Sequence, residues 1–202
     1  MEKRIRIGIE LDNVLRNRNK QLLKYYAKDI NNEVIPDEIN DKDTEEVENV
    51  VKFDTIGERN RFIYIDYPFE LFGCANVMDN NLATTLNNWL EELRNVETYG
   101  FDVEVFGRNE EALTIQSSYF FLSKAGCRVR GAFFPENEEE LYGRYDYVFT
   151  ADADFADKMN ESDKNVIFIT QDNKKHPKSS WKEYKTMEDA LGDDNLIKGF
   201  EL

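Results

Sequence analysis

Histidine, cysteine and proline are scarce in this sequence, whose 202 residues include one histidine, two cysteines and four prolines. Cys74 and Cys127 fit no ligand or disulfide spacing motif, so the sequence favours a reducing compartment over a disulfide framework. Because so few nitrogen and sulfur ligands are present, a zinc site is not expected.

Positive charge is also in short supply. The 26 Lys and Arg residues face 41 Asp and Glu residues, which gives a net charge of −15 and an isoelectric point near 4.6. Such a chain repels the phosphate backbone of nucleic acids, which binds proteins mainly through Lys and Arg. Direct nucleic-acid binding is therefore not expected.

Long hydrophobic runs are missing as well. No segment approaches the roughly 20 apolar residues of a membrane span, and the amino-terminal residues MEKRIRIGIE lead into an expected strand without the apolar core of a secretory signal. A hydrophobic content of 41% still suffices for a core, and the length suits one domain or one domain with a small insert. We expect a cytoplasmic protein without a membrane partner. The acidic, Asn- and Lys-rich, proline-poor composition would also suit a phage-encoded protein of the virion or host cytoplasm.

The stretch from Arg4 to Leu15, RIRIGIELDNVL, organises the rest of the chain. Its apolar residues predict a short buried strand. Glu10 and Asp12, two residues apart, project to the same side of an extended backbone at the carboxyl end of that strand. Ligands of parallel α/β sheets bind at this end, and paired carboxylates there suit a divalent cation with a phosphate. Two solvated acids at a strand end are the alternative, and the spacing does not decide between them.

An alternation of strands and helices predicts the fold class. Apolar runs predict strands at residues 4–11, 101–106, 127–134, 145–150 and 166–170, and helical spacing predicts helices at 13–29, 79–95 and 109–125, the last closed by Gly126. Strands separated by helices imply a parallel sheet with right-handed crossovers. We therefore expect a doubly wound α/β domain.

Two segments stand apart from this alternation. Acidic residues far outnumber basic ones in residues 29–60, which is typical of a solvated face or mobile loop, with a lid or a partner-docking surface as the alternative. Residues 61–73, RFIYIDYPFELFG, are the most aromatic part, with a short strand ending at Pro68 as one interpretation. Their rings either pack the insert onto the core or offer a stacking wall for a ligand or partner. We expect a core of residues 1–28 and 76–202 and an insert of residues 29–75.

The motif ELDNV, after the first strand, resembles the D-x-D-x-[TV] motif that opens the haloacid dehalogenase (HAD) superfamily. The resemblance implies that Glu10 stands at the nucleophile position and Asp12 at the general acid/base position. It also implies a substrate-selecting cap at the place of the insert. Asn173 and Trp181 carry a weaker similarity to the 5'(3')-deoxyribonucleotidase-like branch of the superfamily.

The later motifs of the superfamily are altered here. Gly107 stands where the phosphate-holding Ser or Thr is expected, followed by Arg108 and Asn109. No Lys precedes the fourth strand, where Arg144 is the nearest cation and Arg130 a poorer choice. In YDYVFTADADF, Ala151 takes the place of the first metal-binding acid and Asp152 that of the second.

The resemblance thus implies phosphate contacts at Gly107, Arg108 and Asn109, and a Mg²⁺ site at Glu10, Asp12 and Asp152. Misplacing a nucleophile by about an ångström costs on the order of 100-fold, and losing a charge-stabilising donor costs about as much. The leading hypothesis is therefore a nucleotidase-related, catalytically impaired domain with a binding or structural role, which meets a protein partner through residues 29–73. The alternative is an active Mg²⁺-dependent phosphohydrolase of a small phosphate ester such as a nucleoside monophosphate. In that case Glu10 is the nucleophile, Asp12 the acid/base and Arg144 the charge clamp.

Overall fold

The computed structural model describes residues 4–97, 99–108, 110–170 and 181–200. It contains two compact units. The first comprises residues 1–15, 78–108 and 126–202, and the second comprises residues 16–77 and 109–125. The predicted division into a core and an insert, with boundaries at residues 28/29 and 75/76, stays a prediction. The boundaries of the two compact units fall instead after residues 15 and 77, and residues 109–125 belong to the second unit.

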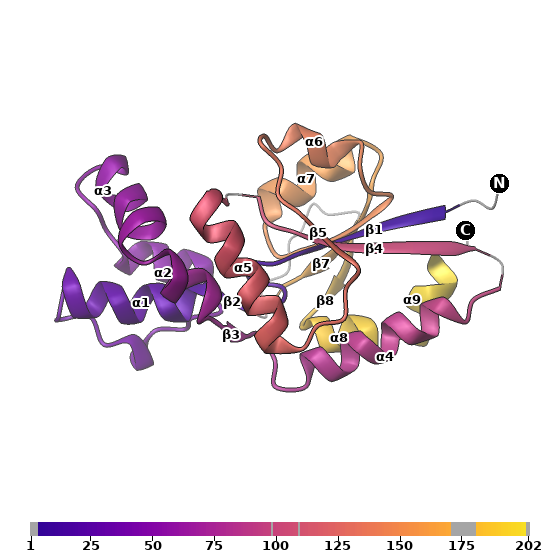
Figure 1. The fold of residues 1–202 in the computed structure, drawn as a ribbon, viewed down its shortest axis with the longest axis horizontal. Coiled ribbons are helices and arrows are strands. Elements are labelled where there is room, and N and C mark those ends of the chain that lie inside the picture. Colours follow the sequence, from indigo (N-terminus) through magenta and orange to yellow (C-terminus); the bar gives the residue numbers. More distant parts are fainter. Residues whose placement is uncertain (1–3, 98, 109, 171–180, 201–202) are drawn as a thin grey trace. The chain divides into compact units, whose positions relative to one another are not determined.

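A six-stranded sheet forms the first unit, in the order β5-β4-β1-β6-β7-β8 with every neighbouring pair parallel (Figure 1). The strands are β1 (Arg4–Glu10), β4 (Gly100–Phe106), β5 (Gly131–Phe133), β6 (Tyr147–Thr150), β7 (Asn165–Ile169) and β8 (Lys182–Tyr184). β1 lies inside the sheet between β4 and β6, which confirms that its carboxyl end lies at a central position. The strand expected at 127–134 is shorter, because only residues 131–133 pair with β4. β8 was not expected from the sequence.

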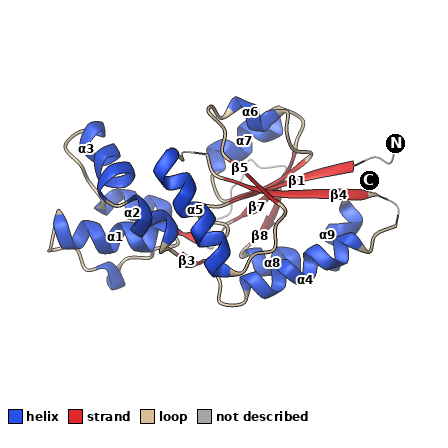
Figure 2. Cartoon of the chain, in the orientation of Figure 1, coloured by secondary structure: helices blue, strands red, loops and turns tan. Residues whose placement is uncertain are grey.

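Helices cover both faces of this sheet, as a doubly wound fold requires (Figure 2). α6 (Glu139–Tyr142) and α7 (Ala153–Glu161) lie on one face, and α4 (Leu82–Arg94), α8 (Met187–Leu191) and α9 (Asp194–Gly199) lie on the other. Consecutive side chains of a strand point to opposite faces. Accordingly, Val148 joins the apolar cluster that includes Met159 of α7, while the ring of Phe149 meets Trp89 of α4, with centroids 5.9 Å apart.

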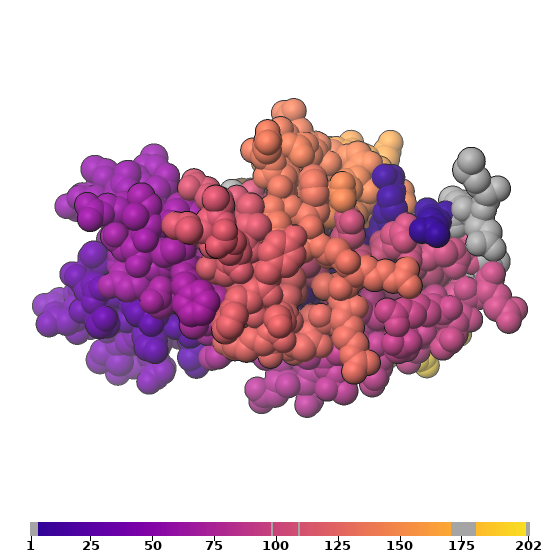
Figure 3. Space-filling model, viewed as in Figure 1, coloured from indigo at the N-terminus to yellow at the C-terminus, as the bar shows by residue number. Residues whose placement is uncertain are grey.

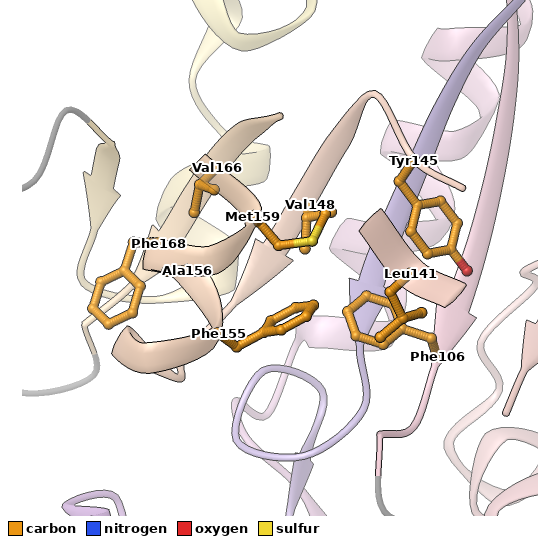
Figure 4. Packing of buried hydrophobic residues seen from close by; sticks show 9 residues of the cluster. All are labelled: Phe106, Leu141, Tyr145, Val148, Phe155, Ala156, Met159, Val166 and Phe168. Atoms are coloured by element: carbon orange, nitrogen blue, oxygen red, sulfur yellow. The ribbon is translucent and has the colours of Figure 1, made fainter. Parts of the chain in front are cut away.

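The apolar layer on the α6–α7 face fixes the ends of the strands that matter for function (Figure 4). Phe106, the last residue of β4, stacks on Tyr145 at 5.5 Å and lies 5.8 Å from Phe155 in the first turn of α7. Both Phe106 and Phe155 are fully buried. This packing holds the residue after β4 and the start of α7 close together.

The second unit is mainly helical. Its elements are α1 (Arg18–Asp29), a 3₁₀ turn η1 (Pro36–Glu38), α2 (Thr44–Val50), α3 (Ile56–Arg61), the π-helical turns η2 (Phe62–Asp66) and η3 (Phe69–Gly73), α5 (Ala112–Ala125), and the antiparallel strands β2 (Arg16–Asn17) and β3 (Asn76–Val77). α1 begins at Arg18 and not at Asn13 as expected, because the Asn17 side chain caps it by accepting from the Lys20 N–H at 3.0 Å. Asn13 instead has a φ of 61° in the preceding turn. Gly126, with φ of 75°, follows α5 and confirms the predicted helix end.

The acidic residues 29–60 contain the turn η1, the helix α2 and most of α3, joined by loops. Asp43 caps α2 by accepting from the Glu46 N–H, and Thr55 caps α3 by accepting from the Glu58 N–H, each at 3.1 Å. Val47 is the one side chain buried within residues 29–60. The expected solvated face is present, and its purple surface is visible in Figure 3.

The aromatic residues 61–73 form π-helical turns and no strand. The Tyr67 N–H donates to the Phe62 carbonyl at 3.1 Å, and the Cys74 N–H donates to the Phe69 carbonyl at 2.9 Å, each spanning five residues. The rings pack inside the second unit, where Phe62 lies 4.8 Å from Tyr67 and 5.3 Å from Phe53.

No helix in the described ranges is both long and apolar enough to cross a membrane.

Candidate functional site

In the first unit, one cation and three acids come together at the carboxyl ends of three strands and the N-cap of α6, which is Glu138. Glu10 is the last residue of β1 and Thr150 the last of β6, and Arg108 lies two residues beyond β4. Asp152 is the N-cap of α7, where its Oδ1 accepts from the Phe155 N–H at 2.9 Å. The three strands are neighbours in a parallel sheet, so their carboxyl ends meet at one edge, as the sequence predicted.

The guanidinium of Arg108 is the centre of this group. Its Nε donates to Glu10 Oε1 at 2.7 Å, its Nη2 donates to Asp152 Oδ2 at 2.6 Å, and its Nη1 donates to Glu138 Oε2 at 3.0 Å. The guanidinium carbon lies 4.5 Å from the centroid of the Phe155 ring. Only 12% of the Arg108 side chain is exposed. We call Arg108, Glu10, Asp152 and Glu138 the Arg108 cluster.

Further hydrogen bonds fix the acids of the cluster. The Thr150 hydroxyl donates to the second oxygen of Glu10 and accepts from the Asp152 N–H at 3.1 Å. Glu138 Oε1 accepts from Lys158 Nζ at 2.8 Å and from the Tyr142 hydroxyl at 2.9 Å. Both oxygens of Glu10 and both oxygens of Glu138 are thus occupied by donors.

The electrostatics follow from this arrangement. Burial raises the pKa of Glu10 above its usual value of 4.5, although Arg108 and Thr150 act against it. Burial also tends to raise the pKa of Asp152, but the charge and hydrogen bond of Arg108 outweigh it and lower that pKa below 3.8. The pKa of Glu138 is lowered in the same way, because its hydrogen bonds from Lys158, Tyr142 and Arg108 outweigh burial. Burial tends to lower the pKa of Arg108, but Glu10 and Asp152 raise it, so the guanidinium stays charged.

The cluster as arranged does not fit a Mg²⁺ ion. Mg²⁺ needs oxygen ligands at about 2.0–2.1 Å in octahedral geometry, whereas oxygens of Glu10 and Asp152 are directed at the nitrogens of one guanidinium. No group of three His, Cys, Asp or Glu side chains in the described ranges has a geometry that could hold a metal. The positive charge that a metal would supply is already provided by Arg108.

The other predicted site residues are placed as follows. Asp12 lies in the turn after β1 and is half-buried. The Gly107 N–H, expected to hold phosphate, donates to the Phe133 carbonyl at 3.2 Å and extends the sheet. Asn109 and Asn173 fall outside the described residues. Trp181 packs against Phe168, with ring centroids 4.6 Å apart.

Arg144 is not brought to this edge. It precedes β6, at the opposite end of that strand from Thr150, and its Nε donates to Glu104 Oε2 at 2.8 Å while its guanidinium lies 3.8 Å from the Phe133 centroid. Arg108 is the cation against Glu10 instead. Sequence reasoning missed Thr150 and Glu138. The predicted strand YDYVFT ends at Thr150, so its position at the carboxyl edge of the sheet could have been predicted, whereas nothing in the sequence indicated a role for Glu138.

A second buried ion pair, which the sequence did not reveal, lies in the second unit. Arg16 Nη2 donates to Glu110 Oε1 at 2.8 Å, and the two side chains are 0% and 1% exposed. The Ser118 hydroxyl accepts from Arg16 and donates to Glu110, each at 2.5 Å. The Arg16 guanidinium also lies 4.9 Å from the Phe72 centroid and 5.7 Å from the Phe121 centroid. The completeness of this network indicates a structural role.

No family model matches the sequence, and no curated protein matches it. Solved structures do. A protein of Burkholderia xenovorans LB400, described as haloacid dehalogenase-like, superposes with a TM-score of 0.58 at 13% identity, over 98% of each chain. The chain has a HAD-like fold.

Two further HAD-like structures agree with this assignment. Bacillus subtilis YfnB, a HAD-type hydrolase crystallised with magnesium, matches with a TM-score of 0.57 at 11% identity, over 92% of this chain and 96% of its own. The L-2-haloacid dehalogenase PA0810 matches with a TM-score of 0.50 at 9% identity, over 94% of this chain and 98% of its own. At these identities the HAD-like fold is shared, while the chemistry has to be argued from the residues. The nucleotidase-like branch stays a prediction.

Proposed function

We propose that this HAD-like chain is a catalytically impaired relative of the phosphohydrolases and serves as a binding protein. The observation that carries the proposal is the position of Arg108, which bridges Glu10 and Asp152 at 2.7 and 2.6 Å. A nucleophilic carboxylate needs a free oxygen within about 3–3.5 Å of the reacting phosphorus. Both oxygens of Glu10 are hydrogen-bonded, and the residue is 4% exposed. Attack by Glu10 would therefore require the ion cluster to open first.

The surface of the second unit supports the binding role. All eight large hydrophobic side chains that are exposed in the described ranges belong to that unit: Ile30, Ile35, Ile56, Ile65, Phe69, Leu113, Tyr119 and Phe120. Five of them fall within residues 29–73, where acidic residues outnumber basic ones. Exposed apolar side chains among charges of one sign favour a partner of opposite charge. The proposed partner is a protein with a basic, partly apolar surface.

Three finer points rest on the sequence alone and belong to this proposal. We place the ancestry nearest to the 5'(3')-deoxyribonucleotidase-like branch and the protein in the cytoplasm, or in the virion or host cytoplasm if the gene is phage-encoded. The alternative function, a Mg²⁺-dependent phosphohydrolase of nucleoside monophosphates, makes the opposite prediction in an activity assay.

The test of impaired catalysis is a hydrolysis assay with a panel of nucleoside monophosphates and other small phosphate esters. The wild type is compared with Asp12→Asn, with and without Mg²⁺ and EDTA. We expect no turnover under any of these conditions and no rise in melting temperature with Mg²⁺, since a metal that binds the folded state must stabilise it. Turnover that needs Mg²⁺ and disappears in Asp12→Asn would establish the phosphohydrolase instead.

The test of binding uses two helical peptides with the same leucine face, one with lysines and one with glutamates on the other face. We expect calorimetry to show that the lysine peptide binds, that salt weakens it, and that the glutamate peptide does not bind. Replacing both Ile56 and Ile65, which are 77% and 67% exposed, with Ser should weaken binding without lowering stability. Equal binding of both peptides, or of neither, contradicts the proposed partner chemistry.

A further inference from the structure

A hollow of about 460 Å³ lies at the amino ends of β1 and β4, in the first unit. Arg4 opens β1 opposite Gly100, which opens β4, and residues 100–103 of β4 line the hollow. The Arg108 cluster lies at the carboxyl ends of the same two strands. A seven-residue strand is roughly 20 Å long, so the two places are separate. The volume falls within the range of about 300–1,000 Å³ that is typical of small-ligand sites.

The lining of this hollow is basic, in contrast to the chain as a whole. Four arginines line it, namely Arg4, Arg94, Arg128 and Arg130, and only two acids do, Glu97 and Asp102. Arg4 Nη1 already lies 3.1 Å from Asp102, and Arg94 Nη1 lies 2.5 Å from Glu91. In a protein of net charge −15, carboxylates are the most abundant charged groups, and a hollow with an excess of guanidinium groups is unusual.

Arg128 and Arg130 are the two cations that remain available. They lie on the segment between α5 and β5, both are exposed, and within the described ranges neither forms an ion pair. In Figure 3 this salmon-coloured segment projects over the magenta surface of α4 and β4. Both residues line the same hollow, so one ligand there can reach both side chains. Arg130 also lines an adjoining hollow of about 290 Å³ together with Arg6 and Arg144.

We propose that this hollow is a binding site for a small polyphosphate anion, such as pyrophosphate or the phosphate chain of a nucleotide. Guanidinium groups bind phosphate oxygens through paired, charge-assisted hydrogen bonds, and Arg is suited to this because its donors form a fixed fork. A ligand with two or more phosphate groups can engage both Arg128 and Arg130, whereas a single phosphate offers fewer oxygens and less charge to the pair. Tyr99 lies in the same lining and offers an aromatic face to a ligand that carries a base. The site is independent of the Arg108 cluster and of the proposed partner surface.

The experiment is calorimetric titration of the full chain with inorganic pyrophosphate, tripolyphosphate and ATP, at low salt and without metal. We expect saturable binding that salt weakens. Arg128→Gln and Arg130→Gln should each weaken it about tenfold or more, which corresponds to the loss of one hydrogen bond to a charged group. Both side chains are exposed, so the melting temperature should not change and loss of folding is excluded as a cause.

Arg59→Gln is the matched control, because Arg59 is an exposed arginine of the second unit. It should bind all three anions as the wild type does. The proposal is overturned if the wild type binds none of them at millimolar concentration, if the Arg128 and Arg130 variants bind like the wild type, or if Arg59→Gln weakens binding as much as they do. A preference for ATP over tripolyphosphate that is lost in Tyr99→Ala would identify the ligand as a nucleotide. Equal affinities would identify the phosphate chain alone as the recognised group.

Discussion

The Nε–H group of Arg108, which follows β4, donates a hydrogen bond to Oε1 of Glu10 at the end of the neighbouring strand β1, at 2.7 Å. The contact follows from register: Glu10 pairs with Phe106, and Arg108 comes two residues after Phe106. A nucleophilic carboxylate needs a free oxygen within about 3–3.5 Å of the reacting atom, whereas Glu10 is held by a buried cation. This one pair therefore links the stability of the sheet edge to the proposed absence of catalysis.

Replacing Arg108 with Met should destabilise the protein by about 3–5 kcal/mol at neutral pH. The substitution keeps much of the apolar stem but leaves the carboxylates of Glu10, Asp152 and Glu138 without their common counterion, and breaking a buried pair from one side has this cost. Denaturant titration monitored by circular dichroism measures the loss. The penalty should shrink as the pH is lowered, because the protonated acids no longer need a counterion.

Arg128→Met is the control for this variant, since it removes an exposed arginine of the same unit and should change stability by less than about 0.5 kcal/mol. A loss at Arg108 no larger than at Arg128 would show that the cluster contributes nothing to stability.

Replacing Asp152 with Asn should make the protein less sensitive to acid. The folded-state pKa of Asp152 is lowered, so its contribution to stability is present above about pH 4 and is lost as the pH falls through the lowered value. Asn keeps the helix cap of α7 and removes this titration. Glu138, also lowered, adds a loss in the same direction, whereas the raised pKa of Glu10 makes stability fall as the pH rises through its titration.

Unfolding curves at a series of pH values between neutral and acid test this prediction. The wild type should lose more stability on acidification than Asp152→Asn does. Parallel curves for the two proteins would mean that Asp152 does not titrate differently in the folded state.

Replacing Arg16 with Met should cost about 3–5 kcal/mol, since Glu110 then remains buried without its partner. The double variant Arg16→Met with Glu110→Leu should be less destabilised than the sum of the two single variants, by about 0.5–3 kcal/mol. A double-mutant cycle from denaturant titrations measures this coupling. If the losses of stability in the two single variants simply add in the double variant, the contact between Arg16 and Glu110 contributes no interaction energy.

Replacing Gly8 with Ala should destabilise the first unit by about 1–3 kcal/mol through overpacking. A Cβ at this position of β1 would lie 2.6 Å from Cδ2 of Tyr145, whose ring is buried and stacks on Phe106. For a chain of this length the melting temperature should fall by about 2–4 °C per kcal/mol. Gly143→Ala is the control, because nothing lies within 4 Å of its added Cβ and its melting temperature should stay unchanged.

Replacing Glu10 with Asp should not create a phosphatase, although it restores the residue type expected at the nucleophile position. Arg108 still reaches over the site, Gly107 still offers no hydroxyl, and Ala151 still supplies no metal ligand. Residues that act as a unit are strongly non-additive, so we expect turnover only when Glu10→Asp, Gly107→Thr and Ala151→Asp are combined with the removal of Arg108. Single-turnover assays with Mg²⁺ and a nucleoside monophosphate measure this. Activity in Glu10→Asp alone would show that the extra methylene group of Glu10 is the sole cause of the impaired catalysis.

Patterns in the sequence predicted the α/β class, a central strand at residues 4–11, and an approach of Glu10 to Asp152 at one sheet edge; in the structure β1 spans Arg4–Glu10 and both acids accept from Arg108. Each of these depends on local patterns, namely alternating apolar residues, helix caps and acids at strand ends, and the parallel topology then follows from general rules of chain connection. The helices at 18–29, 82–94 and 112–125 were found for the same reason, with errors at their first residues where Asn17 and other caps compete.

The identity of the cation beside Glu10 depends on long-range contacts that local sequence patterns do not encode. Arg108 and Arg144 are both arginines near a strand of the sheet, and no local signal distinguishes them. The difference arises because Arg108 follows the carboxyl end of β4 whereas Arg144 precedes the amino end of β6, which places them at opposite ends of parallel strands. The partners of Arg16 and the grouping of arginines around the hollow could not be predicted from the sequence for a related reason. Such contacts join residues that are far apart in the sequence: Arg16 and Glu110 are separated by 94 positions. The periodic spacing of hydrophobic residues predicts helices and strands, but it does not indicate which charged side chains come into contact.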